Sequence, residues 1–341
     1  MPIEDRGTAT RAASSVRHRI PAPSHLLVLR ENTAWNTLQN DHLAANDDHV
    51  SRSEGSAVNG AAPFSRRRHD SSNSAQARRI IVCADDFGMS KAINEGILAL
   101  ARKGRLSAVS CLTTTPFFRE DAHRLNTLDV DVGVHLNFTE PGLHPETSRP
   151  LPRLIARTYA RTLSLARLCA QIERQLDAFE ATLGHRPHFV DGHQHVHHLP
   201  QIREALIGIL RQRYGDDLPW VRSSRPGLLA GLPFSFKAKA HIIGALGAHR
   251  FARQAYVAGL HTNRSLLGVY DFRGGITGYV RLLLTWLNNA DDGDLLMCHP
   301  ALASADDDAF SAQRNAEFTV LNDDSFPASL LRKGLRLARR P

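Results

Sequence analysis

The sequence is poor in cysteine. Its 341 residues include four, Cys83, Cys111, Cys169 and Cys298, and no two of them form a Cys-x-x-Cys pair, which excludes a paired-cysteine redox or zinc motif. Three of the four lie in short apolar runs. We therefore expect buried, reduced thiols and a cytoplasmic protein.

The sequence also lacks long apolar runs and nucleotide-binding loops. No stretch reaches the roughly 18 consecutive apolar residues of a membrane-spanning helix, so we expect no membrane span. No Gly-x-Gly-x-x-Gly or Walker loop follows the first predicted strand, which argues against a nucleotide-binding Rossmann domain.

Positive charge is in modest excess, with a formal net charge of +8. Much of it is scattered Arg in the N-terminal region and in the tail Arg332–Arg340, and no basic helix carries interleaved aromatic residues. We interpret this as solvated charge and expect no nucleic-acid partner. With 42% hydrophobic and 22% charged residues, the chain can bury a sizeable core.

Residues 1–78 differ in composition from the rest. They mix Ser, Ala, Asn, Asp, Arg and His without sustained periodicity, which predicts a disordered N-terminal extension. A start codon placed too far upstream is the alternative. We expect this segment to be dispensable and one folded domain to cover 79–338.

Within this domain, strand patterns alternate with helix patterns. Helical spacing of apolar residues predicts helices between the strands, the first capped by Ser90 and the last by Ser325. Such alternation implies a parallel sheet, and the domain length favours a single TIM-barrel-like (β/α) barrel over an open doubly wound sheet. The predicted strands are 80–84, 108–113, 131–138, 187–191, 220–223, 294–298 and 318–321.

Acidic and imidazole side chains gather where the predicted strands end. Asp85 and Asp86 follow the first strand, His135 closes the third, the stretch Asp191–His198 follows the fourth, and His299 follows a late strand. In a barrel all carboxyl ends of strands open on the same face. We therefore expect these residues to converge on one pocket.

Each element of this pattern also has a plainer interpretation. The Asp85–Asp86 pair could cap the next helix or form an Asx turn, and His135 could be a hydrogen-bonded core residue. The histidine stretch could be a His-rich surface tract. However, four imidazoles beside a carboxylate are costly to bury without a cation or a hydrogen-bond network.

Alternation along strands assigns different directions to these side chains. Asp85 and Asp86 should point apart, so we expect one to bind a metal and the other to face substrate or water. If the fourth strand continued, Asp191, His193, His195 and His197 would share one side. One carboxylate and two imidazoles around a divalent ion are typical of a catalytic metal site, which suits hydrolysis of an amide or ester.

Four motifs resemble the YdjC-like carbohydrate deacetylases, the family that includes chitooligosaccharide deacetylase. Their order and spacing match as well, and a weaker likeness extends through Arg314, Glu317 and Leu321. The motifs are Ala84-Asp85-Asp86-Phe87-Gly88 with Ser90, Gly133-Val134-His135-Leu136-Asn137, Asp191-Gly192-His193-Gln194-His195-Val196-His197 and Met297-Cys298-His299-Pro300-Ala301.

The resemblance implies a TIM-barrel-like fold and removal of acetyl from an N-acetylated sugar. It implies Asp86, His135 and His193 as metal ligands. Similarity to the broader NodB-type polysaccharide deacetylases implies Asp85 as general base and His299 as a candidate general acid. The ion is Mg²⁺ by resemblance, whereas imidazole ligands by their chemistry favour Zn²⁺. His195 and His197 are then expected to support the site or bind substrate.

The region after the fifth predicted strand is only loosely like the family. In or after the fifth strand, Arg222 or Arg225 could hold a sugar hydroxyl or carboxylate. Trp220, Tyr270 and Phe272 could stack on a sugar ring, although an aromatic residue on a strand is more often part of the core. The motifs do not specify the substrate, so a metal-dependent amide or ester hydrolase acting on a glycolipid is the main alternative. A non-catalytic sugar-binding protein and a homodimer are also compatible with the sequence.

Overall fold

The computed structural model describes residues 77–140, 148–303 and 309–341, so most of the predicted N-terminal extension lies outside the described residues. Eight strands within these ranges belong to one sheet. The strands are β1 (Arg78–Phe87), β2 (Ala108–Cys111), β3 (Asp131–Leu136), β4 (Phe189–Gly192), β5 (Trp220–Val221), β6 (Leu266–Leu267), β7 (Asp294–Cys298) and β8 (Leu335–Leu337).

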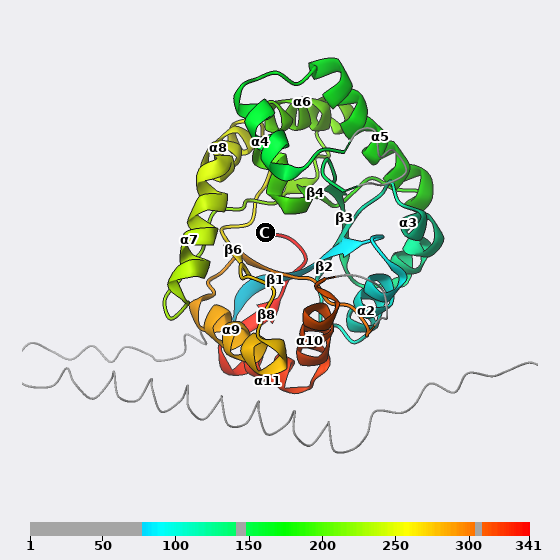
Figure 1. The fold of residues 1–341 in the computed structure, drawn as a ribbon. Coiled ribbons are helices and arrows are strands. Elements are labelled where there is room, and N and C mark those ends of the chain that lie inside the picture. The colour runs from blue at the N-terminus through cyan, green and yellow to red at the C-terminus, as the bar shows by residue number, and fades with distance from the viewer. Residues whose placement is uncertain (1–76, 141–147, 304–308) are drawn as a thin grey trace, which may run out of the picture.

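The strands form a parallel, barrel-like sheet. Seven of them follow the order β5-β4-β3-β2-β1-β7-β6, and β8 pairs with the first residues of β1, at the end of the barrel opposite the carboxyl ends. Isolated parallel bridges join Val221 to Thr262 and Pro226 to Leu266, which brings β5 and β6 together. Figure 1 shows the strands as an inner ring surrounded by helices. The predicted (β/α) barrel-like fold is confirmed.

Alternation along the strands separates two apolar layers. Ile81 and Cys83 pack inside the barrel with Phe189 and Trp220, whose rings stack with centroids 4.3 Å apart. The alternate residues of β1, such as Val82, pack outward against the helices. Because Asp85 is two residues beyond Cys83, the same alternation carries it over the barrel interior.

The helices lie between strands, as the periodicity predicted. Ser90 caps the first of them by accepting a hydrogen bond from the amide of Ile93 at 3.3 Å. The helices are α2 (Lys91–Arg102), α3 (Pro116–Asp121), α4 (Leu151–Tyr159), α5 (Leu165–Leu183), α6 (Ile202–Tyr214), α7 (Phe234–Ile243), α8 (His249–Val257), α9 (Gly275–Asn289), α10 (Ser311–Asn322) and α11 (Ser325–Arg332).

Four details differ from the predicted elements. Ser325, predicted to cap the last helix, is the first residue of α11, and Asp324 holds the N-cap position. The strand expected over 318–321 is wrong, because these residues lie in α10, where Arg314, Glu317 and Leu321 are buried at helical spacing. Strands β6 and β8 were not predicted, since runs of two and three residues carry no usable periodicity. Strand β1 begins at Arg78, one residue before the expected domain start.

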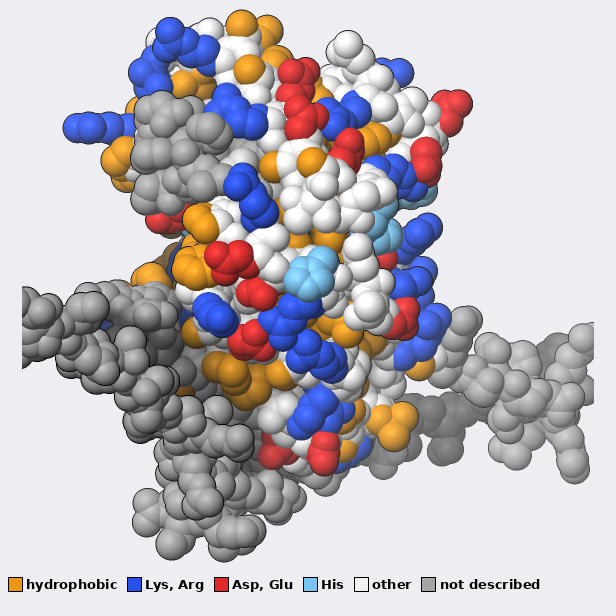
Figure 2. All heavy atoms as spheres, turned by 90° about the vertical axis from the view of Figure 1, so that its right-hand side faces the viewer, with side chains coloured by type: hydrophobic (Ala, Val, Ile, Leu, Met, Phe, Trp, Pro, Cys, Tyr) orange, Lys and Arg blue, Asp and Glu red, His pale blue; other side chains and the backbone are white. Residues whose placement is uncertain are grey.

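None of the helices in the described ranges is long and apolar enough to cross a membrane. Figure 2 shows acidic and basic side chains interspersed over the face that carries α3 and α5. Over the described residues all four cysteines are free, and Cys83, Cys111 and Cys298 are buried, as the apolar runs around them predicted.

Candidate metal centre

A pocket of about 510 Å³ opens at the carboxyl ends of the strands. All five residues predicted as metal ligands or as general base and acid line it: Asp85, Asp86, His135, His193 and His299. They come from four different strands or the loops that follow them. Other lining residues are His195, Glu140, Lys239, Tyr270, Phe272 and Arg314.

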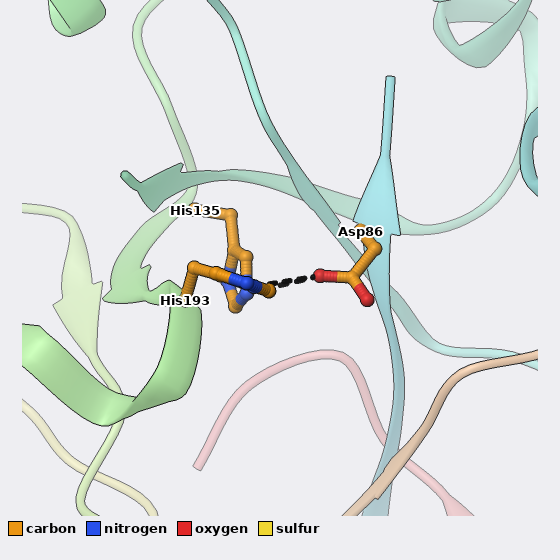
Figure 3. A group of neighbouring side chains, drawn as sticks. All are labelled: Asp86, His135 and His193. Atoms are coloured by element: carbon orange, nitrogen blue, oxygen red, sulfur yellow. Dashed lines mark hydrogen bonds and ion pairs between the residues drawn. The ribbon is translucent and has the colours of Figure 1, made fainter. Parts of the chain in front are cut away.

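Asp86, His135 and His193 point toward one another in this pocket (Figure 3). Each offers one ligand atom, and these atoms all lie within 4.8 Å of one another. His193 Nδ1 is 3.0 Å from Asp86 Oδ1, and His135 Nε2 is 3.6 Å from the same oxygen. The three side chains predicted as ligands therefore form one cluster.

Asp86 reaches this position through an irregularity at the end of β1. Its φ is +71°, and the pairing of β1 with β2 shifts register between Ala84 and Phe87. Such a bulge redirects a side chain relative to regular alternation. Although burial opposes ionisation, Arg314, whose Nη2 donates to Asp86 Oδ2 at 2.8 Å, and His193 hold the pKa of Asp86 well below its usual range.

His193 follows β4 directly and begins a 3₁₀ segment, His193–His198. Gln194 and His195 adopt left-handed φ values of 53° and 60°, so the strand alternation expected to align Asp191, His193, His195 and His197 does not hold. Burial opposes protonation of His193, but the carboxylate of Asp86 raises the pKa of His193 to about 9. The imidazole thus lies in an anionic environment.

His135 is oriented by a carboxylate behind it. Its Nδ1 lies 2.7 Å from Asp191 Oδ1, and the Ser110 hydroxyl donates to the same oxygen at 2.5 Å. Since an ionised carboxylate only accepts, we assign the His135 proton to Nδ1, which leaves the Nε2 lone pair facing Asp86. Residues that hold a metal-binding histidine in this way commonly raise its basicity.

Asp85 lies beneath the cluster, paired with Arg222. The two Nη atoms of Arg222 each donate to one Asp85 oxygen at 2.6 Å, and Nη2 is also 2.5 Å from Asp191 Oδ2. The Arg222 side chain is 1% exposed. The sequence predicts Arg222 as a sugar-binding residue. In the structure its guanidinium group instead lies beneath the pocket, where it pairs with the carboxylates of Asp85 and Asp191.

His299 also lies near Asp85, with Nε2 3.9 Å from Asp85 Oδ2. Burial lowers the pKa of His299 to about 4, so its imidazole is neutral at neutral pH. The ring of Phe272 packs edge-on against it at 4.8 Å. The main-chain amide of His299 donates to Glu317 Oε2 at 2.6 Å, which ties the end of β7 to α10.

Of the other residues predicted to bind substrate, some line the pocket and others do not. His195 lines the pocket and contacts Ser224 Oγ at 3.2 Å. His197 is fully buried and lies 2.9 Å from the carbonyl of Arg222. Arg225 donates to Ser223 Oγ and to the carbonyl of Arg264, outside the pocket lining. Of the aromatic candidates, Tyr270 and Phe272 line the pocket, whereas Trp220 fills the barrel interior.

The donor set fits a divalent ion. One carboxylate and two imidazoles converge on a space open to the pocket, which is a catalytic rather than a closed structural arrangement. Cys83, Asp85 and Asp191 form a second close group, but the Arg222 guanidinium already lies among them, with Nη2 3.0 Å from Cys83 Sγ. The first group is therefore the candidate ion site.

Several residues around the site could not be identified as site residues from the sequence. Asp191 and Ser110 act through His135, and their roles depend on side-chain directions that strand ends do not reveal. Arg314 and Glu317 lie on α10, the helix that follows β7. The only sequence signal for these two was their match to the weaker part of the family pattern.

Glu317 should make stability depend on pH. It is fully buried and accepts a hydrogen bond from Tyr270 at 2.5 Å, and burial raises its pKa from 4.5 to about 7. Between these pH values the unfolded chain loses the proton first, so the free energy of unfolding falls as pH rises. When urea unfolding is measured from pH 4.5 to 7.5, the free energy of unfolding of the wild type should fall by on the order of 3 kcal/mol relative to that of Glu317→Gln. Exposed Glu173→Gln is the control, and a pH-independent difference for Glu317→Gln would contradict this account.

Comparisons with known proteins agree with this architecture. A family model described as YdjC-like protein matches residues 79–332. A carbohydrate deacetylase of Geobacillus stearothermophilus is 28% identical over 273 residues, covering 76% of this chain and 96% of the relative. A carbohydrate deacetylase of Danio rerio is 28% identical over 145 residues, covering 39% of this chain, and the match spans 46% of that relative's length.

Among solved structures, a protein described as a cellobiose-phosphate cleavage protein of Enterococcus faecalis aligns with a TM-score of 0.58. The alignment covers 77% of this chain and 97% of that one at 18% identity. At this identity the likeness supports the fold alone.

Proposed function

The chain belongs to the YdjC-like family, and from this membership and the site geometry we propose that it is a metal-dependent carbohydrate deacetylase. The reaction would be hydrolysis of the acetamide of an N-acetylated amino sugar or oligosaccharide to acetate and a free amine. The observation that carries the proposal is the cluster of Asp86, His135 and His193 in one pocket with Asp85 and His299. Relatives named carbohydrate deacetylases support the choice of substrate class.

A divalent ion held by Asp86, His135 and His193 would supply Lewis acidity to the acetyl carbonyl. Asp85, which lines the pocket, would accept a proton from water as the water oxygen attacks the acetyl carbon. His299 is neutral, so the proton that it delivers to the departing nitrogen must reach it during the reaction. Asp85 Oδ2, 3.9 Å from His299 Nε2, is the nearest described carboxylate oxygen that can pass it on. Breaking the C–N bond then releases the amine.

The pocket wall also offers a surface for the sugar. Tyr270 and Phe272 stack with ring centroids 4.9 Å apart and both line the pocket. Aromatic faces of this kind bind sugar rings through their apolar C–H surfaces. The pocket lining also includes Leu151, Ile243 and Val269. These apolar side chains favour, as second candidate, an amide or ester hydrolase acting on a glycolipid head group.

The proposal is tested by acetate release from diacetylchitobiose and from an N-acetylated glycolipid, before and after chelation. We expect release from the sugar to stop with chelator and to return with added Mg²⁺ or Zn²⁺; Asp86→Asn should not recover. Adding the two ions separately identifies the one that supports turnover. Release from the glycolipid alone would favour the second candidate, and metal-independent release from either would overturn the metal assignment.

A further inference from the structure

A second pocket, of about 380 Å³, lies between α4 and α5 and is lined by four arginines, Arg149, Arg157, Arg167 and Arg174. No acidic residue belongs to its described lining, and among the described residues none of the four forms an ion pair. Like charges gathered in one concave site repel one another unless an anion is bound. Solvated arginines on a mixed-charge surface would not need this arrangement.

The chain around this pocket is strongly biased in charge. Residues 148–172 contain five arginines and no Asp or Glu, in a protein whose overall composition is nearly balanced. Arg149 and Arg174 are half-buried, so their guanidinium groups are less free to spread into solvent than those of exposed Arg157 and Arg167. Arginine side chains are thus concentrated around this pocket.

The pocket also holds neutral hydrogen-bond donors and apolar walls. Ser164 lines it at the start of α5, and the Ser164 side chain makes no capping hydrogen bond to that helix. Gln171 offers an amide, while Phe138 and Leu154 form the apolar sides. Guanidinium groups with hydroxyl and amide donors are the set that binds phosphate oxygens, often two at a time.

We propose that this pocket is a binding site for a phosphate group. The pocket lies close to the candidate metal centre. Helix α4 contributes Leu151 to the first pocket and Leu154 to this one, and Phe138, which lines this pocket, follows His135 by three residues. The phosphate could belong to a soluble phosphorylated ligand or to a phospholipid head group. The proposal concerns binding alone and does not depend on the deacetylase activity.

The test is calorimetric titration of the full chain with inorganic phosphate at low ionic strength. We expect saturable binding that weakens about tenfold or more in Arg149→Gln and in Arg174→Gln, since each loses a charge-assisted hydrogen-bonding group. Exposed Arg167→Gln gives a third variant that should fold normally. The matched control is Arg153→Gln, an exposed α4 arginine outside the pocket lining, which should change affinity less than twofold.

Sedimentation with phosphatidylglycerol and phosphatidylcholine vesicles distinguishes the two sources. Binding to phosphatidylglycerol vesicles that is lost in the pocket variants supports a lipid head group, whereas phosphate binding without vesicle binding supports a soluble phosphorylated ligand. Absence of saturable phosphate binding overturns the site. So does an equal loss in Arg153→Gln and the pocket variants, which would indicate diffuse attraction by surface charge.

Discussion

Asp85→Asn should lose most of its turnover and keep its metal. The amide can still hydrogen-bond a water in the pocket but cannot take its proton, and losing a general base typically lowers kcat by about 10²–10⁴-fold. The fold should survive, because Arg222 retains Asp191 as a partner for its buried charge. Metal affinity should change little, since the Asp85 carboxylate faces Arg222 rather than the ligand cluster.

Asp86→Asn should show the opposite pattern. It removes the one carboxylate of the cluster and leaves the Arg314 guanidinium beside the site without the Asp86 charge to which it donates at 2.8 Å. Both changes weaken attraction for a cation, so calorimetry should show metal binding lost or severely weakened. Turnover should then fall because the ion is missing.

Metal titration and acetate-release rates, measured on both variants, decide between these roles. If Asp85→Asn lost the metal and Asp86→Asn kept it, the assignments would be reversed. If both turned over normally, the pocket would not be the catalytic site. Glu140→Gln is a matched control, because that carboxylate is 44% exposed at the pocket edge, 3.6 Å from His193.

Strand-end placement predicted much of the site because it depends on topology alone. Once strands are parallel in a barrel, Asp86, His135 and His299 must meet at one face, whatever the side-chain details. The direction of each side chain could not be predicted in the same way. A bulge redirects Asp86, and left-handed residues after β4 end the alternation expected for the histidines.

The supporting residues depended on packing that the sequence does not display. Arg222 follows the fifth strand, as the ligands follow theirs, yet its side chain turns under the pocket because two carboxylates are buried there. Glu317 reaches His299 only because α10 lies against the loop that begins after β7. Long-range charge matching of this kind carries no periodic signal.

Arg222→Leu should be among the most destabilising single changes in this chain. It removes the cation shared by Asp85 and Asp191, both of which are almost fully buried. Removing one partner of a buried ion pair typically costs about 3–5 kcal/mol, because the remaining charge loses its compensation. Arg222→Lys should recover part of this, since one ammonium group cannot make the paired hydrogen bonds to both carboxylates.

The stability lost in Arg222→Leu should depend on pH, and the direction of this dependence can be predicted. Although burial opposes ionisation, Arg222 and His135 hold the pKa of Asp191 below its ordinary value of 3.8. The stability from this pairing is present above that ordinary value and is lost as pH falls through the lower folded pKa. The difference between wild type and Arg222→Leu should therefore be largest near neutral pH and shrink in acid, where the unpaired Asp191 carboxylate of the variant can take up a proton.

Urea unfolding at several pH values measures this difference, with Arg225→Leu as the control. Arg225 lies three residues away, is partly buried and donates to Ser223 and to a carbonyl, but forms no ion pair among the described residues. Its replacement should cost about 1 kcal/mol, as expected for ordinary hydrogen bonds. If Arg222→Leu cost no more than Arg225→Leu near neutral pH, the two carboxylates would not rely on Arg222.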